Sequence, residues 1–456
     1  MSDTIAAIAT GGGVSAIGIV RISGGQAIAA ADRVFRPVNG IKLSGAENRR
    51  MYYGSLFGTD GGLIDLCLCT ISRGPESYTG EDTVEFHCHG SPVVLSETLR
   101  ALFSLGVRQA GAGEFTKRAF LNGRMDLTQA EAVIDLIEAE SPAGAQNAAG
   151  QLRGAVGLRL EGVYSSLLDI MAHFHAVLDY PDEDIGDFRI TGYLPALRNA
   201  EDELARMLST HGRGRILREG IPTVIIGRPN TGKSSLLNAL LGYDRAIVTS
   251  IAGTTRDTIE ERIFFGGVLL RLIDTAGLRK TYSTIETLGV QRTLSALGNA
   301  GLVILVLDGS EPLRDEDYEA LRSIPSGVPR IAAVNKSDLP CLIRADELSA
   351  LQTGYCSISA LTGEGLDALE AAVEVLYPGS ETPPAGELIS NARQAEAISR
   401  AKLSISIAIE AINANITPDA VLTDIESALS AIGEVTGKIM REDVISRIFE
   451  RFCVGK

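Results

Sequence analysis

The sequence has no tryptophan and few other aromatic residues. Aromatic side chains make up only 5% of its 456 residues, so its cores must be built mainly from Ala, Leu, Ile and Val. Hydrophobic residues account for 45% and charged residues for 22%, a balance typical of folded globular proteins and not of disordered chains. A chain of this length is too long for one ordinary core and predicts about two to four domains.

Long apolar runs are absent as well. No stretch approaches the roughly 18 residues that a membrane-spanning helix needs. The N-terminal segment carries Asp3 where a secretion signal needs a basic residue, and Arg21 interrupts the apolar stretch that follows. We therefore expect a cytoplasmic protein with no membrane association.

Cysteine is sparse, and the six cysteines are scattered along the chain. This spacing argues against a disulfide framework and predicts reduced thiols. Cys67 and Cys69 fall on one face of an expected strand, as core residues do. His87 and His89 lie on one face of another expected strand and Cys88 on its opposite face, so we expect no metal site from this group.

Basic residues are outnumbered by acidic ones. The chain has 42 Lys and Arg against 57 Asp and Glu, which gives a net charge of −15. This charge argues against a broad, non-specific binder of nucleic acid. A local basic patch is still compatible with it, so any RNA contact must be focal or shared with a partner protein.

The pattern along the chain predicts a multidomain α/β protein. Residues 1–120 read as an α+β domain, and residues 121–217 have the spacing of amphipathic helices. Residues 218–378 alternate short apolar strands with helices, which is typical of a doubly wound, mostly parallel sheet. Helical spacing resumes over residues 379–456. We therefore expect the α/β domain to be inserted into a discontinuous helical domain.

A phosphate-binding loop opens the α/β region. Residues 227–234 read GRPNTGKS, between the strand-like PTVIIG and the helix-like SLLNALLG, which is the context that this motif requires. Backbone N–H groups of such a loop hold phosphates. Lys233 offers its charge to the β- and γ-phosphates, and the Ser234 hydroxyl ligates Mg²⁺.

Further motifs select GTP over ATP. Thr255 in GTTRD can complete the Mg²⁺ shell when a γ-phosphate is present, and Asp274 in DTAG can bind Mg²⁺ through water. Asp338 in NKSD faces the N1–H and 2-amino donors of guanine, a pair that adenine lacks. The N–H of Ala360 in SAL can reach guanine O6. The residues predicted to contact GTP are Asn230, Thr231, Gly232, Lys233, Ser234, Ser235, Thr249, Ser250, Ile251, Ala252, Gly253, Thr254, Thr255, Asp274, Thr275, Ala276, Gly277, Asn335, Lys336, Asp338, Ser359, Ala360 and Leu361.

The hydrolytic machinery departs from that of Ras-type enzymes. Leu278 stands where those enzymes have the glutamine that orients the attacking water, and it can neither donate nor accept a hydrogen bond. Glu286 could hold the water directly or through a second water; the alternative is an ordinary surface-helix residue. Asn230 has an amide oxygen suited to a monovalent cation; its alternative role is a structural hydrogen bond within the loop.

Motifs outside the α/β region identify a family resemblance. The sequence reads RISG at 21–24, SYTGEDTVEFHCHGS at 77–91, GEFTKRAFLNGRMDLTQAEA at 113–132 and FCVGK at 452–456. Together with the GTPase motifs they cover nearly the whole chain, and they resemble the MnmE (TrmE) family. Gly11 departs from the family pattern, which usually has proline there.

The resemblance implies a function in tRNA modification. MnmE proteins act with the FAD-dependent protein MnmG to add an aminomethyl or carboxymethylaminomethyl group at C5 of the tRNA wobble uridine. They use GTP, Mg²⁺, K⁺ and 5-formyltetrahydrofolate or a related tetrahydrofolate. The resemblance also implies a homodimer formed through a folate-binding-like N-terminal domain.

The resemblance also carries residue roles onto this sequence. It implies that Glu286 is catalytic and leaves Cys453 as a functional candidate, against a simple packing role. The implied metal ligands are Ser234 and Thr255 for Mg²⁺, and Asn230, Thr249, Ile251 and Thr254 for K⁺. The implied folate-binding residues are Arg21, Glu85, Arg124 and Lys456.

Two other functions remain compatible with parts of the sequence. A ribosome-assembly or translation switch of the Era or Der type would have a similar GTPase domain. Such proteins usually carry a basic RNA-binding module, which the net charge of −15 disfavours. A one-carbon transferase acting alone would not need GTP.

Overall fold

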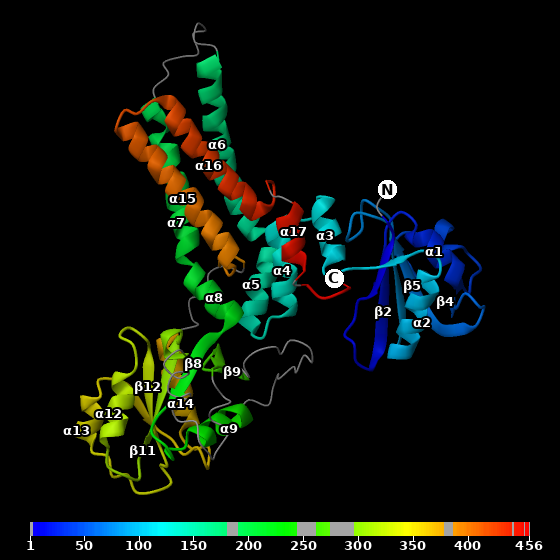
Figure 1. Ribbon diagram of the computed structural model, residues 1–456. Coiled ribbons are helices and arrows are strands. Elements are labelled where there is room, and N and C mark those ends of the chain that lie inside the picture. The colour runs from blue at the N-terminus through cyan, green and yellow to red at the C-terminus, as the bar shows by residue number, and fades with distance from the viewer. Residues whose placement is uncertain are drawn as a thin grey trace. The chain divides into compact units, whose positions relative to one another are not determined.

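The computed structural model describes residues 3–179, 190–243, 261–273, 296–377, 386–439, 442–450 and 452–455 (Figure 1). The chain divides into two compact units. Unit 1 consists of Met1–Ile134, Leu152–Glu201 and Arg400–Lys456, and unit 2 of Asp135–Gln151 and Asp202–Ser399. The four-part division expected from the sequence stays a prediction, because a division by compactness does not test it.

Unit 1 begins with a mostly antiparallel sheet in the order β3-β4-β5-β6-β2-β1-β7, in which only β1 and β7 pair in parallel. Its strands are β1 (Ile5–Ile8), β2 (Ser15–Ser23), β3 (Phe35–Pro37), β4 (Met51–Phe57), β5 (Leu63–Ser72), β6 (Thr83–Gly90) and β7 (Arg108–Gln109). Alternation along β5 buries Cys67, Cys69 and Ile71 and exposes Leu66 and Leu68. The sheet therefore has one apolar face.

Helices α1 (Ala27–Val34) and α2 (Pro92–Phe103) cover that apolar face. Their buried residues pack with the inward residues of β2, β4, β5 and β6 in one core. The opposite face carries Arg21, Glu85 and His87, and α3 (Glu114–Leu121) places Phe115 beside Arg21. The α+β fold expected for this region is confirmed, and its polar face is where the predicted folate residues lie.

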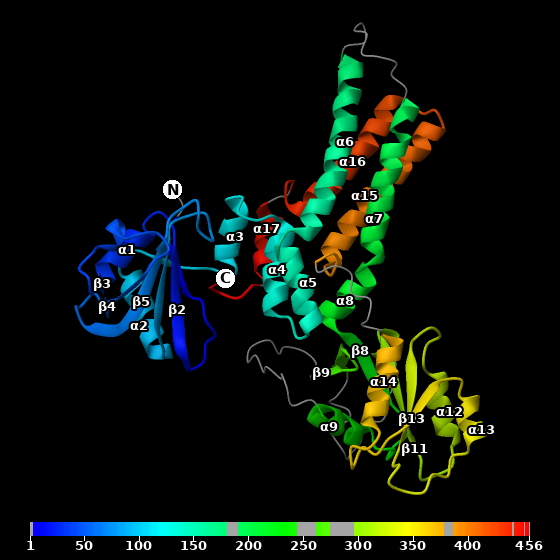
Figure 2. The ribbon, with the colours of Figure 1, turned by 180° about the vertical axis from the view of Figure 1, so that it is seen from behind.

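The described helices that lie between the two sheets in the sequence, and those that follow the second sheet, are mainly amphipathic. They are α4 (Leu127–Ile137), α5 (Pro142–Leu152), α6 (Ala155–Asp179), α7 (Leu194–Ser209), α8 (His211–Glu219), α15 (Ala392–Asn413), α16 (Pro418–Thr436) and α17 (Glu442–Phe449), with short 3₁₀ turns at Leu43–Gly45 and Ile190–Tyr193. In unit 1, α6 packs along α16, and Lys438 pairs with Glu161 between them (Figures 1 and 2). Among the described helices, none is both long and apolar enough to cross a membrane.

Unit 2 contains the second sheet, in the order β13-β12-β11-β8-β10-β9. Its strands are β8 (Ile221–Ile226), β9 (Glu261–Phe265), β10 (Val268–Leu272), β11 (Leu302–Asp308), β12 (Arg330–Asn335) and β13 (Gly354–Ser357), with helices α9 (Lys233–Tyr243), α12 (Asp315–Arg322), α13 (Ala345–Ala350) and α14 (Leu366–Leu376). All neighbours pair in parallel except β9, which is antiparallel to β10 at the edge.

The central strand β11 shows why this sheet needs helices on both faces. Leu302, Ile304 and Val306 belong to one core, and the alternate residues Val303 and Leu305 belong to another. A strand buried on both faces is typical of a doubly wound sheet. The predicted fold class is confirmed. The loops at the carboxyl ends of β8, β11, β12 and β13 share one edge of the sheet.

Candidate functional site

The phosphate-binding loop occupies this carboxyl edge. It leaves β8 after Ile226, and α9 begins at Lys233. Gly227 has φ +148°, and a Cβ there would lie 2.3 Å from the carbonyl oxygen of Val306. Gly232 has φ +97°, and its Cβ would lie 2.1 Å from Nδ2 of Asn335. Both glycines are required, because any side chain would collide with the neighbouring strands.

Lys233 is held inside the loop. Its ammonium donates to the carbonyl oxygens of Gly227 at 2.8 Å and Arg228 at 2.7 Å. Burial lowers the pKa of Lys233, and the charge of Arg228 lowers it further. A phosphate group would relieve both effects by supplying a negative partner, which is the role that the sequence predicts for this lysine.

Asn335 connects the phosphate loop to the guanine motifs. It ends β12, and only 3% of its surface is exposed. Its amide nitrogen donates to the carbonyl of Thr231 at 2.8 Å, and its amide oxygen accepts from the N–H of Ala360 at 2.9 Å. One buried side chain thus joins three motifs that are distant in sequence, and it brings Thr231, Asn335 and Ala360 together.

The carboxylate that the sequence predicts to contact guanine is oriented by a hydroxyl. Ser359, fully buried, donates to Oδ1 of Asp338 at 2.6 Å and accepts from the N–H of Thr362 at 3.2 Å. Asp338 itself is exposed, as a residue that contacts a base must be. Leu361 is 84% exposed, so its contribution to the site would come from its backbone.

Arg228 forms a buried ion cluster that the sequence reasoning missed. Its guanidinium lies 2.7 Å from Glu311, 3.3 Å from Asp317 and 3.9 Å from Asp308. Asp308 also pairs with Lys336 at 2.6 Å. The cluster therefore links the phosphate loop to the NKSD motif. A carboxylate at the end of the buried strand LVILVLD was the available signal.

Opposing effects set the charges in this cluster. Burial disfavours the charged form of Arg228, but the hydrogen bond to Glu311 and the carboxylates of Asp317 and Asp308 outweigh it and raise the pKa of Arg228. Burial likewise opposes the charge of Asp308, yet Lys336 and Ser310 lower the pKa of Asp308 overall. The pKa shifts of Arg228 and Asp308 therefore both favour the charged form, which is the form that their ion pairs require.

Several predicted site residues lie outside the described residues. They are Thr249, Ser250, Ile251, Ala252, Gly253, Thr254, Thr255, Asp274, Thr275, Ala276, Gly277 and Glu286. Of the phosphate-loop residues, Asn230 is exposed with φ +67°, in the left-handed region that non-glycine residues rarely adopt. Ser234 and Ser235 are exposed in the first turn of α9.

A second candidate site lies on the polar face of the first sheet. Arg21 of β2 pairs with Glu85 of β6 at 2.7 Å, and these residues are directly opposite in the ladder. The Arg21 guanidinium also lies over the rings of Tyr78 and Phe115, with its carbon 5.5 and 5.7 Å from their centroids. The structure thus brings together two of the four predicted folate residues and adds Tyr78, an aromatic platform within the SYTGED motif.

His87 completes this polar group. Its Nε2 lies 3.6 Å from Oε2 of Glu85, and this buried nitrogen has no hydrogen-bond partner among the described residues. A buried polar atom in this state is usually satisfied by a water molecule or a bound ligand. Sequence reasoning assigned no role to His87. Its position two residues after Glu85, on the same strand face, was the available signal.

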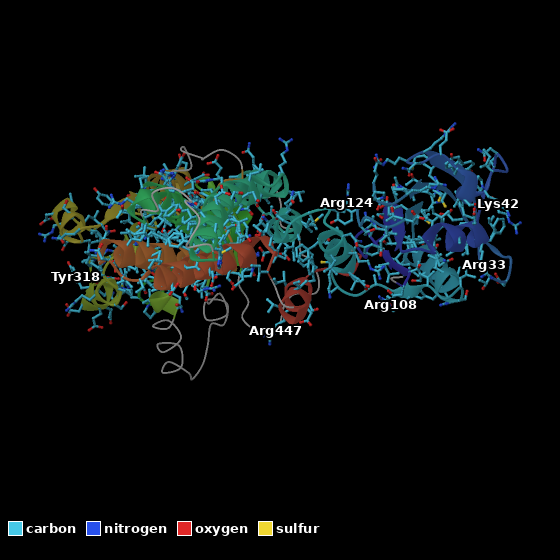
Figure 3. The ribbon with its side chains drawn as sticks, turned by 90° about the horizontal axis from the view of Figure 1, so that it is seen from above. Arg33, Lys42, Arg108, Arg124, Tyr318 and Arg447 are labelled. Atoms are coloured by element: carbon cyan, nitrogen blue, oxygen red, sulfur yellow. The ribbon has the colours of Figure 1, made fainter. Side chains whose placement is uncertain are left out.

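The other predicted folate residues are placed only in part. Arg124 is exposed and follows α3, and Figure 3 shows it on the side of the first sheet away from Arg33 and Lys42. Lys456 lies outside the described residues. Its neighbour Gly455 approaches β1 so closely that a Cβ there would lie 2.1 Å from the carbonyl oxygen of Ile8. Gly455 therefore lies against β1, the strand that pairs with β2.

Cys453 lies in the same terminal segment. Its side chain is exposed, and its carbonyl accepts from the N–H of Gly113 at 3.2 Å. Gly113 adopts φ +61° and has room for no side chain, because Phe452 would be 2.7 Å from its Cβ. The exposure of the thiol does not fit the alternative of a buried packing residue.

Comparison with known proteins gives matches over almost the whole chain. A family model described as the MnmE helical domain matches residues 127–453, and one described as the GTP-binding protein TrmE N-terminus matches residues 4–124. The tRNA modification GTPase MnmE of Alkaliphilus metalliredigens (strain QYMF) is 42% identical over 100% of both chains. That of Symbiobacterium thermophilum is 44% identical over 100% of this chain and 99% of its own. Among solved structures, the G domain of the T. maritima FeoB iron transporter is 31% identical over 34% of this chain and 97% of its own, with a TM-score of 0.26.

Proposed function

The chain belongs to the MnmE family, and from that premise we propose that it is a GTPase of tRNA modification whose nucleotide site is built around Asn335. The observation that carries the proposal is the pair of hydrogen bonds from Asn335 to Thr231 and Ala360. These two bonds fix the position of the phosphate loop relative to the guanine motifs. An Era- or Der-type switch would share only this domain, whereas the resemblance extends through residues 4–124.

The proposed reaction couples GTP hydrolysis to a change in tRNA. Acting with the FAD-dependent protein MnmG, the chain would help to install an aminomethyl or carboxymethylaminomethyl group at C5 of the wobble uridine. The one-carbon unit would come from 5-formyltetrahydrofolate or a related tetrahydrofolate. We further propose a cytoplasmic homodimer that forms through the N-terminal domain.

The proposed hydrolytic step uses residues of the phosphate loop and of the segment after DTAG. Ser234 and Thr255 would ligate Mg²⁺; Asn230, Thr249, Ile251 and Thr254 would ligate K⁺. The exposed amide of Asn230, on a loop residue with φ +67°, fits this role. Bound K⁺ would supply the positive charge that an arginine finger supplies in other switches. Lys233 neutralises the phosphates, and Glu286 orients the attacking water.

We expect GTP turnover to be faster in KCl than in NaCl at equal ionic strength. Asn230→Ala should abolish this preference, because it removes a ligand of the monovalent cation. Glu286→Ala should lower kcat by roughly 10²- to 10⁴-fold in either salt, the range for loss of a group that positions or activates the nucleophile. Steady-state phosphate release measures both effects.

The matched control for these variants is Asn299→Ala, since Asn299 is exposed and precedes the amino end of β11, whereas the phosphate loop lies at the carboxyl ends of the strands. It should keep the K⁺ preference of the parent chain. Equal rates in the two salts for the parent would contradict cation-assisted hydrolysis. An absolute need for an activating protein in saturating KCl would do so as well.

The folate proposal depends on the polar face of the first sheet. Glu85 offers a carboxylate for the amino-pyrimidine edge of a pterin, and Arg21, Arg124 and Lys456 offer charge for the glutamate tail. The Nε2 of His87, which has no hydrogen-bond partner in the described part of the chain, adds a polar contact, and the ring of Tyr78 adds an aromatic one. The residues present therefore fit a folate.

Glu85→Gln is expected to weaken binding of 5-formyltetrahydrofolate about 10- to 100-fold. The reason is that glutamine has one accepting oxygen where the carboxylate has two and carries no charge, and a hydrogen bond to a charged group contributes about 1.5–3 kcal/mol. Isothermal titration calorimetry on the full chain measures the change. GTP turnover should stay the same.

Glu97→Gln serves as the control for this substitution. Glu97 also pairs with an arginine, Arg100 at 2.6 Å, but on the exposed surface of α2. Its loss should leave folate affinity within a factor of about two, as expected for an exposed pair. Equal affinities of the Glu85→Gln and Glu97→Gln chains would exclude Glu85 from the site.

A further inference from the structure

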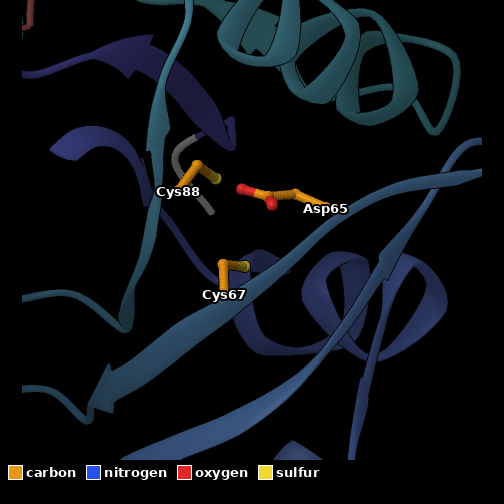
Figure 4. Close-up of side chains that lie close together, drawn as sticks. All are labelled: Asp65, Cys67 and Cys88. Atoms are coloured by element: carbon orange, nitrogen blue, oxygen red, sulfur yellow. The ribbon is translucent and has the colours of Figure 1, made fainter. Parts of the chain in front are cut away.

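Two thiols and a carboxylate lie close together on the apolar face of the first sheet of unit 1. The ligand atoms of Asp65, Cys67 and Cys88 all lie within 4.8 Å of one another, and Figure 4 shows the three side chains directed toward a common point. Cys67 and Cys88 are 4% and 2% exposed, and 8% of the Asp65 side chain is exposed. This group is separate from the nucleotide site and from Arg21 and Glu85, which lie on the other face of the sheet.

The pairing of β5 with β6 explains why these three side chains lie close together. Leu68 of β5 faces His87 of β6, so continuing the antiparallel register by one step sets Cys67 opposite Cys88. Asp65 precedes Cys67 by two residues and therefore falls on the same face of β5. Directly opposite residues have Cβ atoms about 4.5–5.5 Å apart, which is the separation that lets two thiols share one ligand.

The group is electrostatically unusual for a protein core. The hydrogen bond between the thiols raises the pKa of Cys67, and burial and the charge of Asp65 raise it further. The same hydrogen bond lowers the pKa of Cys88, although burial and the charge of Asp65 act in the opposite direction. A divalent cation would stabilise both thiolates and neutralise the carboxylate.

The carboxylate is also held in place as metal ligands are. The backbone N–H of His89 donates to Oδ2 of Asp65 at 2.8 Å, and the His89 ring nitrogen Nδ1 lies 2.7 Å from Oδ1. Hydrogen bonds of this kind orient ligating carboxylates in metal sites. His89 thus has a positioning function toward Asp65, whose oxygens it holds on the side of the thiols.

We propose that Asp65, Cys67 and Cys88 bind a thiophilic divalent cation of the Zn²⁺ class, with water as the fourth ligand. Zinc–sulfur bonds of about 2.3 Å and zinc–oxygen bonds of about 2.0–2.2 Å put neighbouring ligand atoms roughly 3.5–4 Å apart. That spacing is compatible with the observed limit of 4.8 Å. Binding releases both thiol protons to solvent and forms two metal–sulfur bonds, so it needs no oxidant. The bound ion would cross-link β5 to β6.

The test is a titration of the full, reduced chain with Cd²⁺ and Zn²⁺. We expect one cation per chain by elemental analysis and a thiolate-to-Cd²⁺ charge-transfer absorption that Zn²⁺ competes away. Cys67→Ser and Cys88→Ser should lose this absorption, and His89→Ala should lower the affinity about 10- to 100-fold. GTP turnover should not change.

Cys69→Ser provides the matched control, because Cys69 lies on the same face of β5 and is equally buried but is not part of the group. It should bind Cd²⁺ as the parent does. Circular dichroism of each variant shows whether the sheet is intact, and Asp65→Asn gives a milder change if a serine variant unfolds. The proposal would be overturned if the parent chain showed no such absorption. It would also be overturned if the folded Cys88→Ser and Asp65→Asn chains absorbed as strongly as the parent.

Discussion

Replacing Asp338 with asparagine is expected to lower kcat/KM for GTP by roughly 10⁴-fold and to raise it for xanthosine triphosphate. A site built to hydrogen-bond a polar edge rejects a mismatched partner by about 10⁴- to 10⁵-fold. In the proposed site, the carboxylate of Asp338 would accept from guanine N1–H and the 2-amino group. An asparagine amide instead presents N–H toward that amino group, whereas xanthine has a carbonyl at this position and can accept from it.

The hydroxyl of Ser359 makes this change selective. It donates to Oδ1 of Asp338 at 2.6 Å, and an asparagine carbonyl can accept the same bond. The substituted side chain should therefore keep its orientation and alter only the base that it reads. Asp338→Ala is the control: it should lose activity with both nucleotides. Steady-state hydrolysis of the two triphosphates distinguishes these cases. An unchanged preference for GTP in the asparagine variant would mean that Asp338 does not read the base.

The nucleotide site could be predicted because its chemistry lies in short contiguous motifs. The phosphate loop needs glycine at 227 and 232, and the structure shows Val306 and Asn335 filling the space that a side chain would need. The meeting of Thr231, Asn335 and Ala360 follows from a parallel sheet, whose strand ends share one edge. Local sequence and fold class together were sufficient to predict that these three residues lie close together.

The other contacts could not be predicted, because they join residues that are far apart in the sequence and meet only when the strands pair. Arg21 and Glu85 were assigned by resemblance, and their contact arises from the pairing of β2 with β6, which are 64 positions apart at these residues. The group of Asp65, Cys67 and Cys88 depends on the register of β5 against β6, which a shift of one residue would destroy. Sequence analysis correctly placed Cys67 in the core but had no means of finding its opposite residue.

Arg228 was missed for a different reason. It occupies a position of the phosphate-loop motif where any residue is allowed, so the motif gives no signal. Its importance comes from burial: its side chain is 7% exposed, and the side chains of Asp308 and Asp317 are 3% and 2% exposed. Buried charges are tolerated only when paired, so each member of this cluster requires the others.

We expect Arg228→Met to destabilise unit 2 by roughly 3–5 kcal/mol. Removing one partner of a buried ion pair leaves the remaining charge without compensation, and costs of this size are typical. Methionine preserves most of the apolar part of the arginine side chain, so the loss of stability reports mainly on the removal of the charge. Asp317 would be affected most, because Asp308 keeps its bond to Lys336. Hydrogen–deuterium exchange of the peptides from β8 and α12 localises the effect, which matters because the chain has no tryptophan to serve as a probe.

Arg314→Met is the matched control for this effect. Arg314 pairs with the same Glu311 at 2.9 Å, but its side chain is 55% exposed. An exposed pair contributes about 0–1 kcal/mol, so this variant should exchange almost as the parent does. If Arg228→Met behaved like Arg314→Met, the buried cluster would contribute no more than a surface ion pair.

A double variant separates the charge effect from a general loss of packing. In Arg228→Met with Asp317→Asn, both members of the pair are neutral, so no uncompensated charge remains between them. The double variant should then be more stable than the sum of the single changes predicts, by about 0.5–3 kcal/mol. Asp317 also accepts the N–H of Arg314 at the start of α12, and asparagine preserves that carbonyl oxygen. Strict additivity would mean that Arg228 stabilises the phosphate loop through contacts other than this pair. In that case the predicted tie between the loop and α12 would be wrong.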